Sequence, residues 1–240
     1  MPHSRHANAS AGHLAGNGRS SAGAGRTKRA NGKANGAFAA RSSFVLYVEG
    51  PRDQGLLAAW ATRFSPRLGV SLEGATVILG GCQPARAAEQ FRALRADDPE
   101  ARGLCLLDRD ADDAPRPPPI SEPGLDFFTW GRRHIESYLL VPGAIRRSLR
   151  LPDDDARIER FFRSALPTTE EGLGAIDAKS LFAFRGELQR LLGRPVRPAH
   201  VARAMHAGEI HAHVLDLLAR VRFGLEPGET RAEFRVPRDE

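Results

Sequence analysis

Two acidic residues stand where an apolar segment meets a Gly-Pro turn. The segment FVLYV, residues 44–48, is short, β-branched and aromatic, as buried strands are, and Glu49 follows it directly. Asp53 begins the segment DQGLLAAWATRF, residues 53–64, whose apolar residues recur at helical spacing, and its position predicts a helix N-cap. Acids on both sides of a strand-to-helix turn could bind a cation, cap a helix or face solvent. The choice depends on whether other acids reach the same place.

A second acidic group follows another predicted strand. The segment GLCLL, residues 103–107, runs into DRDADD, which places Asp108 and Asp110 two residues apart. In an extended segment such residues face the same side, with Cα atoms about 6 to 7 Å apart. The carboxyl ends of parallel strands meet at one edge of a sheet. Because a cation relieves the repulsion between converging carboxylates, these acids together with Glu49 predict a site for Mg²⁺ or Mn²⁺.

The segments around these acids alternate between strand and helix patterns. ATVIL, residues 75–79, predicts a buried strand, PARAAEQFRALRA, residues 84–96, a helix that begins with proline, and LDFFTW, residues 125–130, a further strand. This alternation predicts an α/β fold with a mostly parallel, Rossmann-like sheet flanked by helices. After about residue 142 the patterns are helical, in PGAIRRSLR, DDDARIERFFRSAL, AKSLFAFRGELQRLLG, PAHVARAMHAG and EIHAHVLDLLARVRF. We therefore expect a helical C-terminal extension over residues 143–240.

The excess positive charge lies in the first forty residues. The chain has 35 basic and 29 acidic residues, and residues 1–40 contain six of the basic ones and no acid, so the remainder is formally neutral. This segment has almost no large apolar side chains to offset its ordering entropy, which predicts a disordered basic tail. It could be a solvated leader or a weak nucleic-acid-binding arm. The rest of the chain could engage a polyanion only through local patches or bound metal ions.

Several classes of protein are disfavoured by the sequence. It has neither an apolar run of membrane-spanning length nor the apolar core of a secretory signal. Cys82 and Cys105 form no CxxC pair, which predicts reduced thiols in a cytoplasmic protein that does not associate with membranes. No GxxxxGK[ST] segment is present, so the chain carries no P-loop ATPase of its own.

Three motifs in order resemble one known family. VEGPRD (48–53) and LLDRD (106–110) look like the TOPRIM domain of topoisomerases, primases, recombination mediators and nucleases. WGRRHIESYLLVP (130–142) is similar to the R-R-x-I-E-N-Y-L-L segment of TOPRIM nucleases of the OLD (overcoming lysogenization defect) family, with Ser137 in place of the usual asparagine. The resemblance implies a TOPRIM-like catalytic domain over residues 41–142. It also implies an acidic metal-binding set of Glu49, Asp53, Asp108, Asp110 and Glu136, with Glu49 also catalytic.

Lys179 is the only lysine from residue 41 onward, where arginine supplies every other basic side chain. An ammonium is a compact charge whose pKa can shift, which a guanidinium cannot imitate. OLD-type nucleases carry a catalytic lysine in a helical segment after the I-E-N-Y motif, and the resemblance implies that Lys179 stabilises charge on the reacting phosphate. An ordinary surface lysine on an amphipathic helix is the alternative.

Other polar residues have competing interpretations. Arg132 and Arg133 could hold a phosphate by forked hydrogen bonds, or form a salt bridge that fixes the acidic loop. His211 and His213 would point about 200° apart on one helix, which argues against a shared metal ion.

These observations predict a Mg²⁺- or Mn²⁺-dependent endonuclease that hydrolyses phosphodiester bonds in DNA, with two metal ions. A non-catalytic cation-binding module that binds nucleic acid or a partner ATPase is one alternative, and a TOPRIM ribonuclease is another. OLD nucleases usually carry an ATPase domain, so a separately encoded ATPase is a candidate partner, and a second copy of the chain is another. A topoisomerase is disfavoured, because Tyr47 and Tyr138 lie in a predicted buried strand and in the third motif.

Overall fold

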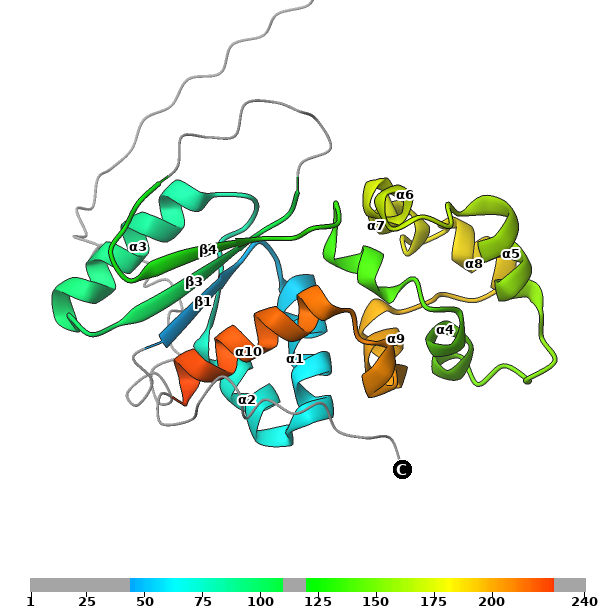
Figure 1. Cartoon of the computed structure of the whole chain (residues 1–240), viewed down its shortest axis with the longest axis horizontal. Helices are drawn as coiled ribbons and strands as arrows, with labels where there is room; N and C mark the ends of the chain where they lie inside the picture. Colours follow the sequence, from blue (N-terminus) through cyan, green and yellow to red (C-terminus); the bar gives the residue numbers. More distant parts are fainter. Residues whose placement is uncertain (1–43, 110–119, 227–240) are drawn as a thin grey trace, which may run out of the picture. The chain divides into compact units, whose positions relative to one another are not determined.

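The chain is built around a four-stranded, all-parallel sheet. The structure is a computed structural model that describes residues 44–109 and 120–226. The strands are β1 (Phe44–Val48), β2 (Thr76–Ile78), β3 (Arg102–Leu107) and β4 (Leu125–Thr129), in the spatial order β2-β1-β3-β4 (Figure 1). The predicted α/β class with a parallel sheet is confirmed. The predicted tail over residues 1–40, Asp110 with the segment that follows it to residue 119, and residues 227–240 of the predicted extension lie outside the described residues.

The connections between strands create a switch point between β1 and β3. From β1 the chain passes through α1 (Pro51–Phe64) and α2 (Pro66–Ala75) to β2 on one side, and it returns through α3 (Pro84–Asp97) to β3 on the other side. From β3 it moves further away, to β4. In open parallel sheets the crevice at such a point, outside the carboxyl ends of the strands, is where sites form.

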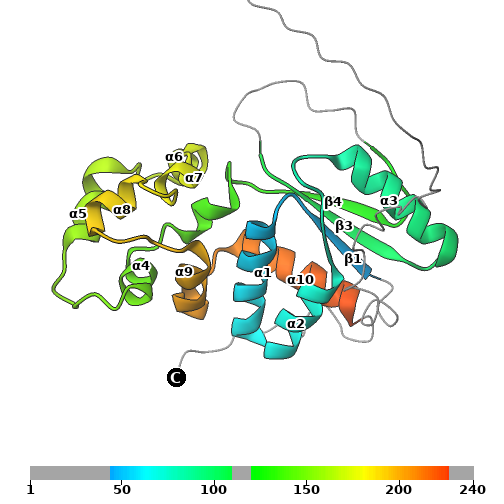
Figure 2. The same cartoon turned by 180° about the vertical axis from the view of Figure 1, so that it is seen from behind.

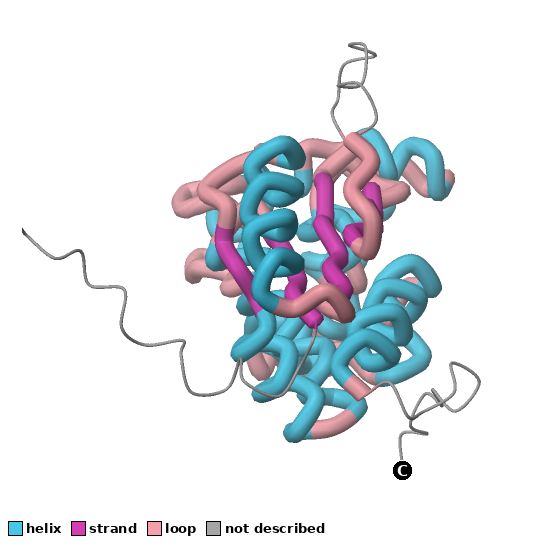
Figure 3. The backbone as a smooth tube through the Cα atoms, turned by 90° about the vertical axis from the view of Figure 1, so that its left-hand side faces the viewer, coloured by secondary structure: helices cyan, strands magenta, loops and turns pink. Residues whose placement is uncertain are grey.

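Helices cover both faces of the sheet. On one face, Tyr47 and Cys105 pack against Phe91 of α3. On the other face, Leu46 and Leu104 belong to a larger cluster that includes side chains of α1, α2 and α10 (Ala212–Leu225). Figures 1 and 2 show α3 on one side of the strands and α1 with α10 on the other, and Figure 3 shows the strands between helices. Neighbouring β1 residues thus face opposite layers, as the pleat requires.

Every element from residue 142 to residue 225 is helical, as predicted. These elements are α4 (Pro142–Ser148), α5 (Arg157–Ala165), α6 (Glu170–Ala175), α7 (Ala178–Leu181), α8 (Glu187–Leu192), α9 (Pro198–Ala204), the 3₁₀ turn η3 (Ala207–Glu209) and α10. A 3₁₀ helix, η2 (Ile135–Leu139), precedes them. The Trp60 Nε1–H group of α1 lies 3.2 Å from Met205 Sδ, just after α9, and α10 lies on the sheet, so one core continues across residue 142. None of the helices in the described part of the chain is long and apolar enough to cross a membrane.

The structure differs from the sequence expectation at α2, at α6, which no predicted helical segment covers, and around Lys179. Helix α2 was not predicted, although Ser65 accepts a hydrogen bond from Leu68 N–H and Pro66 occupies the first turn, which is a common N-terminal pattern. The single helix expected around Lys179 is divided into α7 and α8 by a tight turn at residues 182–186.

Candidate active site

Glu49 and Asp108 meet at the carboxyl edge of the two central strands. Each directly follows its strand, and Glu49 Oε1 accepts a hydrogen bond from the Asp108 N–H at 3.2 Å. The N–H groups of Gly80 and Gly81 donate to the Glu49 carbonyl at 3.0 and 2.9 Å, with φ of 82° and 126° that favour glycine. The Cys82 thiol also hydrogen-bonds the Glu49 carboxylate. Burial raises the pKa of Glu49, and the Asp108 N–H only partly offsets this.

Asp53 lies in the first turn of α1 and joins the same electrostatic cluster. Gly50 occupies the N-cap position, so the predicted N-cap role of Asp53 is wrong. Asp53 instead stands at the third helical position and accepts the Gly50 N–H at 2.8 Å. Burial, together with the charges of Asp108 and Glu136, raises the pKa of Asp53 to about 6 despite that hydrogen bond. The carboxylate therefore faces other acids without enough positive charge to compensate.

Lys179 comes to this edge from α7. Its Nζ lies 2.5 Å from Asp108 Oδ2, which is an ion pair between residues far apart in the sequence. Burial alone would lower the pKa of Lys179, but the hydrogen bond and charge of Asp108, with the charges of Glu136 and Glu49, raise it. Lys179 is thus held as a cation beside Asp108, although its side chain is 42% exposed on the surface of α7.

Glu136 is the most deeply buried acid of the cluster. It lies in η2 with no exposed surface, and its Oε1 accepts a hydrogen bond from Arg52 Nη1 at 3.0 Å. Its Oε2 is buried with no hydrogen-bond partner among the described residues. A buried polar atom without a hydrogen bond is costly, so Oε2 could accept a further donor or a cation.

Two residues that the sequence analysis did not assign to the site lie within it. Arg52 lies between Glu49 and Asp53 in the first motif and donates a hydrogen bond to Glu136. Its position between two predicted site residues is the sequence feature that could have identified it. From the sequence, His134 is expected to face solvent or to form a local hydrogen bond, but its ring is largely buried, with Nδ1 3.7 Å from Asp177 Oδ1. Burial and the nearby Lys179 charge lower the pKa of His134, whose surroundings also include Asp108 and Glu136.

The structure brings four of the five predicted metal-binding acids together, while Asp110 lies outside the described residues. Within residues 44–109 and 120–226, no three Asp, Glu, His or Cys side chains converge closely enough to enclose a metal ion. The arrangement instead places Lys179 against Asp108 and Arg52 against Glu136. A divalent cation would therefore compete with two basic side chains for these acids.

Arg132 is used within the fold and does not face a phosphate-binding surface. Its Nε and Nη2 donate to the two carboxylate oxygens of Glu170 at 2.8 and 2.7 Å, and its Nη1 donates to the Ser137 carbonyl at 2.6 Å. The salt-bridge alternative therefore describes Arg132, although the acid belongs to α6 and not to the acidic loop. Arg133 is half-exposed, and its charge acts on Asp177. The pKa of Asp177 is lowered mainly by its hydrogen bond with Ser180, and further by the charges of His134 and Arg133.

His211 and His213, at the start of α10, lie closer together than expected. His211 is the N-cap of α10 and not part of the helix, so its ring centroid lies 4.8 Å from that of His213. Tyr138 OH lies 3.0 Å from His213 Nδ1 and accepts the Arg132 N–H at 3.1 Å. These contacts connect η2 to α10 and hold the segment that carries Glu136.

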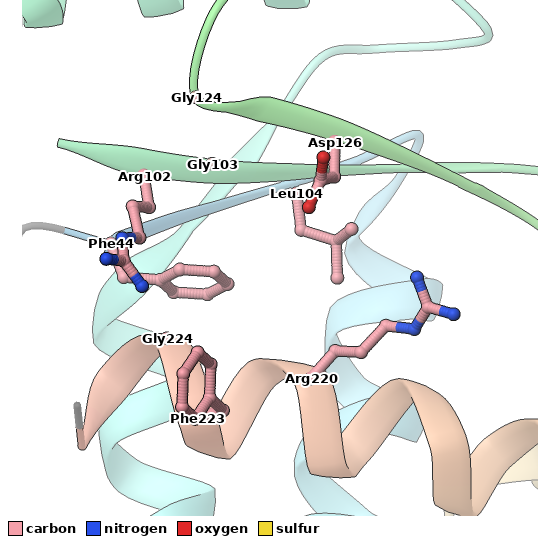
Figure 4. Close-up of a pocket in the computed structure, with 9 residues that line it drawn as sticks. All are labelled: Phe44, Arg102, Gly103, Leu104, Gly124, Asp126, Arg220, Phe223 and Gly224. Carbon is pink, nitrogen blue, oxygen red and sulfur yellow. The ribbon is translucent and has the colours of Figure 1, made fainter. Parts of the chain in front are cut away.

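A separate hollow of about 580 Å³ lies at the amino-terminal edge of the sheet. It lies between the first residues of β1 and β3 and the end of α10, and Phe44, Arg102, Arg220 and Phe223 are among its lining residues (Figure 4). None of the predicted site residues lines it. The candidate chemistry is therefore at the opposite end of the strands.

The fold and the site together define an α/β protein with an all-parallel, Rossmann-like sheet and an acidic cluster at its switch point. Comparison of the chain with protein-family models, with curated proteins and with solved structures returns no match.

Proposed function

We propose that this chain is a Mg²⁺- or Mn²⁺-dependent nuclease of the TOPRIM type that hydrolyses phosphodiester bonds in DNA. The main support is the position of Asp108 at the switch point of the sheet, where its N–H donates to Glu49 and its carboxylate pairs with Lys179. The TOPRIM identity is supported by the three motifs, because the acids that they contribute, Glu49, Asp53, Asp108 and Glu136, share one cluster with Lys179. Asp110 remains a further candidate ligand from the same motif as Asp108.

The cluster offers carboxylate oxygens, the ligands that hard divalent cations take, although the described acids do not enclose an ion by themselves. Four carboxylates face the two basic side chains Lys179 and Arg52, and one buried oxygen of Glu136 has no hydrogen-bond partner in the described structure. Glu49, Asp53, Asp108 and Glu136 would hold the cations, directly or through water. When bound, divalent cations would activate an attacking water molecule and stabilise the leaving oxygen.

Lys179 is suited to electrostatic stabilisation and unsuited to proton abstraction. Burial lowers the pKa of Lys179, but Asp108 and the other acids raise it beyond its ordinary value, so the side chain stays an ammonium at neutral pH. A fixed ammonium can stabilise negative charge that develops on the phosphate oxygens. Its hydrogen bond to Asp108 would also orient that carboxylate.

The test is cleavage of supercoiled plasmid DNA by the purified full chain. We expect nicking with Mg²⁺ or Mn²⁺ and none with EDTA, and Asp108→Ala should reduce the rate by at least about 100-fold, as loss of a central electrostatic group does. Asp154→Ala is the matched control, because Asp154 is an exposed acid in the turn between α4 and α5. Cleavage by Asp108→Ala at the wild-type rate would refute the proposal, provided that circular dichroism shows both variants folded.

A non-catalytic cation-binding module is the second candidate function. One observation bears on it: Lys179 and Arg52 pair with Asp108 and Glu136, so these four side chains have structural partners that need no catalytic role to account for them. Such a module would show a cation-dependent melting temperature without cleaving DNA or RNA. Including RNA in the cleavage assay also separates a deoxyribonuclease from a ribonuclease. Co-purification would reveal a separately encoded ATPase, and the solution mass would reveal a homodimer.

A further inference from the structure

The turn between α7 and α8, residues 182–186, exposes a large aromatic side chain close in sequence to Lys179. Phe184 is 79% exposed, the highest value among the exposed large hydrophobic residues in the described part of the chain. The residue two positions earlier, Phe182, is buried in the core. Of the two phenylalanines of this turn, only Phe184 therefore presents its ring to solvent.

The backbone holds this turn in a demanding conformation. Arg185 has a φ of 60°, a value that residues with a side chain rarely adopt. At Gly186 a Cβ atom would lie 2.5, 2.6 and 2.8 Å from the carbonyl oxygens of Ser180, Leu181 and Ala183, so only glycine fits. Gly186 N–H donates to Ala183 O at 2.8 Å, and Arg185 N–H donates to Gln189 Oε1 at 2.9 Å. Strained backbone that its surroundings fix in this way is concentrated at functional sites.

The exposed ring has a basic side chain beside it, and the exposed acid Glu187 begins the next helix. The Arg185 guanidinium carbon lies 5.4 Å from the centroid of the Phe184 ring, a cation–π arrangement. Asp177, an acid on the same segment, is engaged by the N–H and hydroxyl of Ser180. An aromatic face with an arginine beside it is how proteins bind bases of single strands, the ring stacking on a base and the cation attracting the backbone.

The position of Phe184 relative to Lys179 fits a strand that passes both. The two residues are five positions apart, so their Cα atoms are separated by less than about 18 Å, the reach of five fully extended residues. Lys179 contacts Asp108 in the candidate active site. A few nucleotides could therefore extend from a phosphate near Lys179 to a base on Phe184.

We propose that Phe184 is a base-stacking residue for single-stranded DNA. The bases of a duplex are already stacked on one another, so the ring can engage only an unpaired base, and the site discriminates strandedness. This inference rests on the proposed function for the position of the phosphate near Lys179. The stacking itself can be measured without cleavage.

The test is equilibrium binding of fluorescein-labelled oligonucleotides to the full chain in EDTA, read by anisotropy. Wild-type protein should bind a single-stranded DNA more tightly than the matching duplex. Phe184→Ala should weaken single-strand binding by about 5- to 150-fold, the measured range for loss of one stacked base, with little change for the duplex. Phe184→Trp should retain binding. An RNA oligonucleotide of the same sequence is measured in parallel. If Phe184→Ala weakens RNA binding as much as DNA binding, the stacking is not specific for DNA.

Phe223→Ala is the matched control. Phe223 is also exposed, at 40%, with Arg102 6.0 Å from its ring centroid, but it lies in the hollow at the other edge of the sheet (Figure 4). Its loss should leave oligonucleotide binding unchanged. If Phe184→Ala binds single-stranded DNA as tightly as the wild type, the inference is overturned, even if the wild type cleaves DNA. Equal weakening of single-strand and duplex binding would overturn it too. Stacking without any cation-dependent cleavage would instead leave the inference standing and remove the proposed nuclease activity.

Discussion

Asp53 illustrates how one residue can serve both the fold and the site. Its carboxylate accepts the Gly50 N–H at the start of α1, an interaction that secures the turn after β1. The same carboxylate is partly buried beside Asp108 and Glu136, which disfavours its charge. The local helix geometry therefore holds the Asp53 carboxylate where its negative charge is unfavourable.

This conflict predicts a stabilising substitution. The folded-state pKa of Asp53, about 6, exceeds the ordinary 3.8, so its stability contribution is present at low pH and lost as the pH rises through 6. Asp53→Asn keeps an acceptor for Gly50 N–H and removes the charge. We expect it to raise the free energy of unfolding by about 1 to 3 kcal/mol near neutral pH in EDTA.

Urea unfolding of both proteins across the pH range checks this expectation. The difference in the free energy of unfolding between Asp53→Asn and the wild type should shrink towards zero near pH 4, since Asp53 is then protonated in the folded wild type. A stability difference that does not depend on pH would contradict the electrostatic explanation. The substitution should also weaken cation binding, which separates the stability role from the functional one.

At the scale of elements, Tyr138 connects η2 to α10. Its hydroxyl accepts the buried Arg132 N–H and contacts His213 Nδ1, while the Arg132 side chain holds α6 through Glu170. These contacts fix the segment that carries Glu136 and His134. The orientation of the acid therefore depends on helices that follow it in the sequence.

Tyr138→Phe should lower the free energy of unfolding by about 1 to 3 kcal/mol, because the buried Arg132 N–H loses its acceptor. Chemical denaturation gives the value. Tyr47→Phe is the matched control, since Tyr47 is equally buried, in β1, and lies outside this network. An unchanged free energy of unfolding in Tyr138→Phe would show that the hydroxyl bond does not support η2.

At the scale of the whole molecule, cation binding should be coupled to folding. The acids lie just after β1, in α1, just after β3 and in η2, so they converge only in the folded chain. A cation that binds only this state stabilises it by about 2.7 kcal/mol at one hundred times its Kd, which corresponds to about 5 to 10 °C in Tm for a protein of this size.

Differential scanning fluorimetry with increasing Mn²⁺ tests this coupling. The wild type and Asp154→Ala should shift alike, and EDTA should reverse the shift. Asp108→Ala should shift little, because Asp108 stands between Glu49 and Lys179 in the cluster. Equal shifts in Asp108→Ala and the wild type would place the cation elsewhere on the molecule.

The sequence by itself determined the alternation of strands and helices and the position of Glu49 and Asp108 at strand ends. It also singled out Lys179 as the only lysine from residue 41 onward. Those features depend on periodicity and on neighbours within a few residues, which a sequence records directly. The same local reasoning missed α2 and α6 and misassigned Asp53, because a short helix and a cap are decided by a few competing hydrogen bonds.

Only the tertiary structure decided which charges meet. The pairing of β1 with β3, the ion pair between Lys179 and Asp108, and the burial of Glu136 against Arg52 join residues many positions apart. The use of Arg132 by Glu170 and the close approach of His211 to His213 depend in the same way on how helices pack. Such contacts follow from the burial of apolar faces on distant segments, which position polar side chains that no local pattern specifies.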